Sequence, residues 1–176
     1  MIHAPLKESW YVLYTMPRCE RRICQSLSLM EIASFLPTQK VVRQWTDRKR
    51  KVEVPLFPNY VFVNIPPQQR SRVFVTKGII RYVSIRGEPC EIPASVIDSI
   101  KIIIKGKPEV INGIFCEGDE VIVCRGPLAG LNGRLVEKRG KYRVCVRLEV
   151  LNHSILVEVL ASEIQKVSEG CLIATT

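Results

Sequence analysis

The sequence predicts an α+β domain, built as an antiparallel sheet with flanking helices, followed by a small β-barrel. Two sequence patterns along the chain predict this order. Up to residue 106, runs of aromatic and branched residues alternate with segments of helical spacing, and from residue 115 onward short strands are separated by glycine turns. We therefore expect a first domain over residues 9–106, a linker over residues 107–114 and a barrel over residues 115–168.

The segment 55–65, with the sequence PLFPNYVFVNI, is expected to be the central strand of the first domain. Its two prolines fix φ and lack amide donors, so pairing should begin after Pro58. Alternation then places Tyr60 and Phe62 on one face of the sheet and the aliphatic residues on the other. The run 10–15 predicts a strand beside it.

Helical spacing occurs three times in the first domain. Pro17 suits the first turn of a helix. The buried stripe of this helix consists of Cys19, Ile23, Leu27 and Met30. A short helix is expected over residues 68–76 and a third over residues 93–104, where Gly106 is a stop signal.

About five short strands are expected in the second domain. From Tyr142 to Glu149, apolar residues alternate with polar ones, which is typical of a half-buried strand. This alternation and the glycine turns favour β-structure over a helical hairpin as the resting state.

The positive charge of the chain is confined to its first part. Residues 1–106 contain 17 Lys/Arg against 8 Asp/Glu, a net charge of +9, whereas residues 107–176 contain 9 of each. A field of this sign steers polyanions and supplies phosphate contacts, so a nucleic-acid neighbour is favoured over a basic surface kept for solubility.

The sequence lacks motifs for catalysis or metal binding. The two histidines, His3 and His153, have no cysteine or carboxylate at metal-ligand spacing, and no phosphate-binding glycine motif is present. The seven cysteines form no C-x-x-C pair and are expected to be reduced thiols. We expect no enzyme, no cofactor and no metal site.

The chain shows no secretory signal and no apolar run of membrane-spanning length. We expect a cytoplasmic monomer that does not associate with a membrane.

Four segments, in this order, resemble the NusG family of transcription elongation factors. They are WYVLY (10–14), LFPNYVFV (56–63), GIIRYV (78–83) and the glycine turn region 117–133. The resemblance covers roughly residues 9–168 and implies an RNA polymerase-binding N-terminal domain followed by a KOW-type β-barrel. Segments 44–49 and 55–63 look closer to the specialised paralogues, the RfaH and UpxY antiterminators, than to housekeeping NusG.

The resemblance implies that the first domain binds the clamp helices of the largest RNA polymerase subunit. The positions that match the family's apolar pocket are Tyr14, Tyr60, Phe62, Tyr82 and Ile97, for which core packing is the competing interpretation. A second polymerase contact matches Arg70, Ser71 and Arg72, where RfaH carries a His-Thr-Thr patch.

Non-template DNA in the transcription bubble is the nucleic-acid partner that the resemblance implies. The candidate contacts are Arg18, Arg21, Arg22 and Lys77 around the first helix, and Arg48, Lys49 and Arg50 in a basic hairpin. A solvated helix face and a solvated hairpin tip are the competing interpretations.

The function implied by the resemblance is transcription antitermination. Such a factor binds RNA polymerase and suppresses pausing or termination on a subset of operons, here those for surface polysaccharide synthesis. The barrel implies a protein partner, with ribosomal protein S10 as the candidate, and the relation to the termination factor Rho is left open. A ribosome-associated KOW-containing RNA-binding protein is the alternative.

Overall fold

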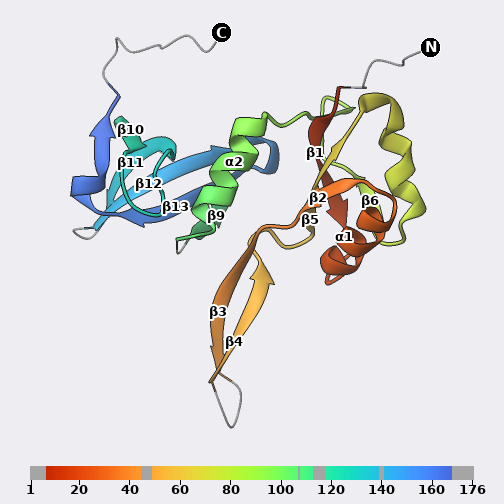
Figure 1. The fold of residues 1–176 in the computed structure, drawn as a ribbon, viewed down its shortest axis with the longest axis horizontal. Coiled ribbons are helices and arrows are strands. Elements are labelled where there is room, and N and C mark those ends of the chain that lie inside the picture. Colours follow the sequence, from red (N-terminus) through yellow and green to blue (C-terminus); the bar gives the residue numbers. More distant parts are fainter. Residues whose placement is uncertain (1–6, 45–48, 107, 113–117, 139–140, 168–176) are drawn as a thin grey trace. The chain divides into compact units, whose positions relative to one another are not determined.

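The computed structural model describes residues 7–44, 49–106, 108–112, 118–138 and 141–167. The chain divides into two compact units, Met1–Ile97 and Asp98–Thr176, which we describe separately (Figure 1). The elements of the first unit are β1 (Ser9–Thr15), α1 (Glu20–Leu29), β2 (Ala33–Phe35), β3 (Thr38–Gln44), β4 (Lys49–Pro55), β5 (Tyr60–Ile65), the 3₁₀ helix η1 (Pro67–Val75), β6 (Ile79–Tyr82), β7 (Ser84–Ile85) and β8 (Glu88–Pro89). Helix α2 (Ala94–Ile103) runs across the boundary.

The first unit is built on a four-stranded antiparallel sheet in the order β2-β5-β1-β6. Strand β5 begins at Tyr60, directly after the Pro58–Asn59 turn, so the predicted start of the central strand is confirmed. The expected antiparallel sheet with helices beside it is present, and the predicted short helix is η1.

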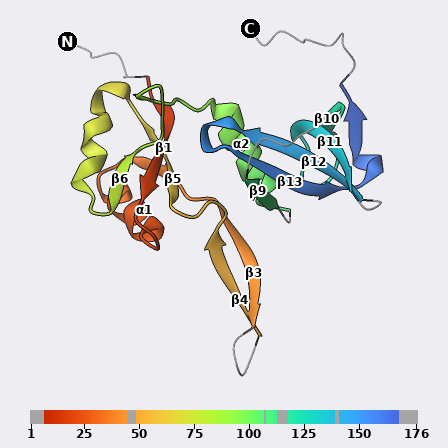
Figure 2. The ribbon, with the colours of Figure 1, turned by 180° about the vertical axis from the view of Figure 1, so that it is seen from behind.

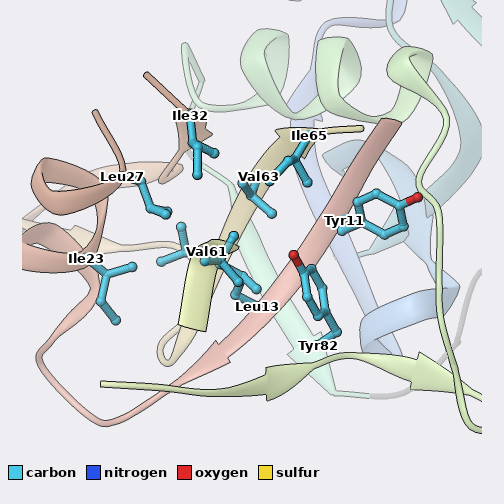
Figure 3. Packing of buried hydrophobic residues seen from close by; sticks show 10 residues of the cluster. Tyr11, Leu13, Ile23, Leu27, Ile32, Val61, Val63, Ile65 and Tyr82 are labelled. Atoms are coloured by element: carbon cyan, nitrogen blue, oxygen red, sulfur yellow. The ribbon is translucent and has the colours of Figure 1, made fainter. Parts of the chain in front are cut away.

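One face of this sheet forms a core with α1 and η1. Ile23 and Leu27 of α1 are fully buried against Val61 and Val63 of β5, as the predicted helical stripe requires, and Val73 of η1 joins the same cluster. Figure 3 shows Ile23 and Leu27 of the helix facing Val61 and Val63 of the strand.

Two tyrosines close one end of this core. Tyr11 and Tyr82 meet edge to face with ring centroids 5.7 Å apart (Figure 3). The Tyr82 hydroxyl donates a hydrogen bond to the Arg70 carbonyl at 2.9 Å, and the Tyr11 hydroxyl donates to Glu91 at 2.8 Å. Burial raises the pKa of Tyr82 to about 12. Burial, and then the bond to Glu91, raises the pKa of Tyr11.

A buried carboxylate joins the start of α1 to the start of β5. Glu20 is 5% exposed, and its Oε1 accepts a hydrogen bond from the backbone amide of Asn59 at 2.8 Å. Asn59 has a φ of 70°, in the left-handed region that asparagine tolerates better than most residues. The carboxylate therefore holds the turn from which the central strand begins.

Strands β3 and β4 form a separate two-stranded sheet. The ribbon extends away from the four-stranded sheet of the same unit in both views (Figures 1 and 2). It is the hairpin that the basic sequence predicts, and its tip, residues 45–48, lies outside the described residues.

The second unit contains six antiparallel strands in the order β14-β10-β11-β12-β13-β9. They are β9 (Glu109–Asn112), β10 (Glu120–Val123), β11 (Asn132–Lys138), β12 (Lys141–Leu148), β13 (His153–Val159) and β14 (Ile164–Lys166), with the 3₁₀ turns η2 (Glu149–Leu151) and η3 (Ala161–Glu163).

The pairing in the second unit concerns the expected barrel and the expected linker. Among the described residues β9 and β14 do not pair with each other, so the sheet is open there and a closed barrel is not shown. Part of the segment 107–114, predicted as a linker, is strand β9, because its residues pair with β13. Both edge strands are short, which limits unwanted pairing at an open edge.

Glycine is required at two positions of the second unit. A Cβ on Gly118, whose φ is 126°, would lie 1.8 Å from the Leu135 carbonyl oxygen, and one on Gly133 would lie 2.5 Å from that of Cys145. Cys145 itself is disulfide-bonded, contrary to the expectation of reduced thiols, whereas the other described cysteines, Cys19, Cys24, Cys90 and Cys124, are free.

Replacing Glu20 by Ala should lower the free energy of unfolding by about 1–3 kcal/mol, because the half-buried Asn59 amide loses its acceptor. Glu20→Gln keeps a carbonyl oxygen at that place and should cost less. Urea unfolding followed by tryptophan fluorescence measures this, since both tryptophans belong to the first unit. Equal losses of unfolding free energy in the two variants would contradict a stabilising hydrogen bond between Glu20 and the Asn59 amide.

The first unit should lose stability as the pH rises from 10 towards 12. The folded state raises the pKa of Tyr82 to about 12, so it binds the phenolic proton more tightly than the unfolded chain does. This stabilisation is fully present below pH 10 and is lost as Tyr82 ionises. Tyr82→Phe should reduce the pH dependence of unfolding in this window and remove the latest step of the tyrosinate absorbance titration.

Candidate functional site

The sheet face opposite to α1 carries a pair of tyrosines. Tyr14 of β1 lies directly across from Tyr60 of β5, with ring centroids 5.5 Å apart and an angle of 54° between the rings. Both side chains are half-buried. We call this surface the aromatic face and define it by Tyr14, Tyr60 and Arg81.

Phe62 follows Tyr60 by two residues in β5 and lies inside the fold on the same side of the sheet. It is fully buried, and its ring lies 6.0 Å from that of Phe35 in β2 and 6.1 Å from that of Phe57. A truncation of Phe62 would therefore cost about 3–5 kcal/mol of stability, so Tyr14 and Tyr60 are the accessible aromatic residues among the predicted pocket positions.

Arg81 extends the aromatic face onto the edge strand β6. It pairs with Tyr14 in the β1–β6 register, and its guanidinium carbon lies 5.5 Å from the centroid of the Tyr14 ring. The side chain is exposed. A cation–π contact of this kind holds the guanidinium near the Tyr14 ring. Arg81 is not among the residues predicted from the sequence.

Tyr82 and Ile97 do not share this surface with the tyrosine pair. Tyr82 lies opposite Leu13 and belongs to the core cluster beneath η1 (Figure 3). Tyr14 and Tyr82 therefore lie on opposite faces of the sheet, because Tyr14 pairs with Arg81, the strand neighbour of Tyr82. Ile97 of α2 is fully buried.

The predicted second contact, Arg70-Ser71-Arg72, lies in η1. The Arg70 guanidinium is 5.5 Å from the centroid of the Tyr11 ring and its Nε donates to the Pro67 carbonyl. Arg72 donates to Gln69 Oε1 at 2.6 Å and to the Met30 carbonyl at 3.3 Å. Both arginines therefore stabilise the turn, while Ser71 is exposed.

Three of the predicted nucleic-acid contacts gather where α1 begins. Arg18, Arg22 and Lys77 are exposed, and we call them the helix-start cluster. A hydrogen bond of 2.8 Å from the Met16 amide to the Gly78 carbonyl brings their two segments together. Arg18 has a φ of 62°, an uncommon conformation for a residue with a side chain.

Arg21 does not belong to this cluster. Its Nη2 lies 3.1 Å from both the Oε2 and the carbonyl oxygen of Glu53 in β4. The Thr38 hydroxyl, and then Arg21, lower the pKa of the Glu53 carboxyl. Arg21 therefore connects α1 to the hairpin.

The basic residues of the hairpin are divided between its two faces. Lys49 is on the same face as Lys51, whereas Arg50 is on the other, because side chains alternate along β4. Lys40, paired with Glu53, shares the face of Lys49 and Lys51. Lys40 and Lys51 are not among the predicted nucleic-acid contacts, although the two-residue alternation of side chains in a strand places Lys51 with Lys49. Arg48 lies outside the described residues.

Two further observations concern the described part of the chain. It contains no group of three or more Cys, His, Asp or Glu side chains placed to hold a metal ion. None of its helices is both long and apolar enough to span a bilayer.

The chain is similar to known proteins in sequence and in fold. The family model described as transcription termination factor nusG matches residues 8–101. The transcription termination/antitermination proteins NusG of Pseudomonas aeruginosa and Vibrio cholerae are each 28% identical to this chain, covering 92% and 94% of it and 100% and 99% of their own lengths.

A solved structure, described as domain interaction in Thermotoga maritima NusG, resembles the fold with a TM-score of 0.51. It is 23% identical and covers 92% of this chain and 98% of its own, a likeness that shows the fold alone. The family model spans more than half of the 176 residues, and the chain therefore belongs to the NusG family of transcription termination factors.

Proposed function

We propose that this protein is a non-enzymatic transcription elongation and antitermination factor that binds the clamp helices of the largest RNA polymerase subunit through its aromatic face. The observation that carries the proposal is the half-buried Tyr14–Tyr60 pair, placed on the sheet face opposite to the core in a chain of the NusG family. Aromatic residues and arginine are the usual hot spots of protein interfaces, which is the composition of this surface.

The helix-start cluster is proposed to bind the non-template DNA of the transcription bubble. Its three cations are exposed and lie in the part of the chain that holds the whole positive excess. Unpaired DNA offers phosphates to such a cluster without requiring base-specific contacts. Ser71 and the arginines beside it remain candidates for a second polymerase contact.

The finer assignments belong to the same proposal. The factor is a specialised paralogue of the RfaH and UpxY type, acting in the cytoplasm as a monomer on a subset of operons such as those for surface polysaccharides. Its second unit is a KOW-type domain that binds a protein, with ribosomal protein S10 as candidate. The absence of net charge in residues 107–176 favours a protein over nucleic acid there.

Tyr60→Ala should weaken binding to purified RNA polymerase by about 30-fold or more, the loss expected when an interface hot spot of about 2 kcal/mol is truncated. Tyr60→Phe keeps the ring and is the matched control. Binding is measured by fluorescence titration of the labelled factor, and circular dichroism checks that each variant folds.

Unchanged polymerase binding by folded Tyr60→Ala and Tyr14→Ala variants would refute the aromatic-face assignment. A pull-down that instead recovers ribosomal proteins and no polymerase subunit would favour the ribosome-associated alternative.

Arg22→Glu should weaken binding to single-stranded DNA and lower the slope of log affinity against log salt by about 0.7 for each phosphate that the variant no longer neutralises. Arg86→Glu makes the same charge change at the exposed β7–β8 turn and serves as the control. Equal effects of the two reversals would mean that only the overall charge matters.

A further inference from the structure

Glu53 connects the root of the β3–β4 hairpin to helix α1. Its Oε1 accepts a hydrogen bond from the Thr38 hydroxyl at 2.9 Å, and its Oε2 pairs with Arg21 Nη2 at 3.1 Å. The same Nη2 donates to the Glu53 carbonyl. We call these contacts the root bridge. The hydrogen bond from Thr38, and then that from Arg21, lower the pKa of the Glu53 carboxyl.

The root bridge matters because the hairpin has little else to orient it. In the described part of the chain, β3 and β4 pair only with each other, and a two-stranded ribbon is marginally stable by itself. A backbone hydrogen bond of 2.8 Å from the Leu56 amide to the Pro37 carbonyl closes its base. The root bridge adds a side-chain link from the ribbon to α1.

The face that carries Glu53 also carries three lysines. Lys40 is paired with Glu53, and Lys51 and Lys49 follow at two-residue steps towards the tip. All three are exposed, and we call them the lysine face. Because Arg21 reaches Glu53 from α1, the lysine face is the side of the hairpin turned towards α1 at its root.

The chemistry of the lysine face suits the phosphates of a duplex. Residues 38–44 and 49–55 contain no aromatic side chain that could stack on an unpaired base, and such stacking is the usual basis of single-strand binding. Lysine binds phosphate as a point charge without reading sequence. A strand of seven residues extends for about 20 Å, and a two-stranded ribbon fits the DNA major groove.

We propose that the lysine face binds the backbone of double-stranded DNA, and that the root bridge is a positioning device that lets the hairpin and the helix-start cluster hold one nucleic acid together. The inference rests on the proposed function, in which the protein contacts the DNA of the transcription bubble. It assigns Arg21 to positioning rather than to DNA contact.

The lysine face is tested by replacing Lys40, Lys49 and Lys51 together with glutamine in the full chain. Anisotropy of a labelled duplex should show weaker binding and a salt slope lower by about 2–3, at about 0.9 for each phosphate left without its lysine. Arg50→Gln, on the opposite face, should change the slope by much less. An unchanged slope in the triple variant, or an equal loss per charge at Arg50, would overturn the assignment.

The root bridge is tested by Glu53→Gln, for which a charge effect and a positioning effect predict opposite changes in affinity for duplex DNA. The variant removes one negative charge, so a surface acting through charge alone would bind duplex DNA more tightly. A positioning role predicts binding weaker by about two- to fivefold, the size of an exposed ion pair. Arg21→Glu should also weaken binding, and combining it with Glu53→Arg should restore it at the original net charge.

These outcomes are separable from failure of the proposed function, because the assay contains no polymerase. A wild-type chain that binds polymerase but has no affinity for duplex DNA, or binds duplex RNA more tightly than duplex DNA, would overturn only the present inference. Tighter duplex binding by Glu53→Gln, or no recovery of affinity in the double variant Arg21→Glu with Glu53→Arg, would show that the root bridge does not position the hairpin.

Discussion

The antiparallel register between β1 and β5 is the constraint on which both surfaces of the first unit depend. It sets Leu13 opposite Val61 on the core side and Tyr14 opposite Tyr60 on the other. A slip by one residue would exchange the two faces and expose the aliphatic side chains. The Glu20 carboxylate, bonded to the Asn59 amide, ties the start of β5 to α1 and so fixes the register and the helix position together.

Local patterns were sufficient to predict most elements of the first unit. The prolines before Tyr60, the stripe that includes Ile23 and Leu27, and the basic hairpin each act over a few residues, and each is present in the structure. The family segments were sufficient to predict membership of the NusG family, which the family model shows.

Features that depend on contacts between distant residues could not be predicted. The pairing of β1 with β6 places Arg81, rather than Tyr82, beside the tyrosine pair. The link between Arg21 and Glu53 joins residues 32 positions apart and shows no periodicity. Strands β9 and β14 are short edge strands, whose formation depends on the neighbours that they pair with.

The pairing of β3 with β4 also limits how the hairpin can change length during evolution. Because the two strands are matched residue for residue, deleting an even number of residues from each strand keeps the remaining lysines on the side of Glu53. An odd deletion would carry the outer cations to the opposite side and bring Arg50 to the side of α1. Relatives with shorter or longer hairpins should therefore differ in steps of two residues per strand wherever this cationic side is retained.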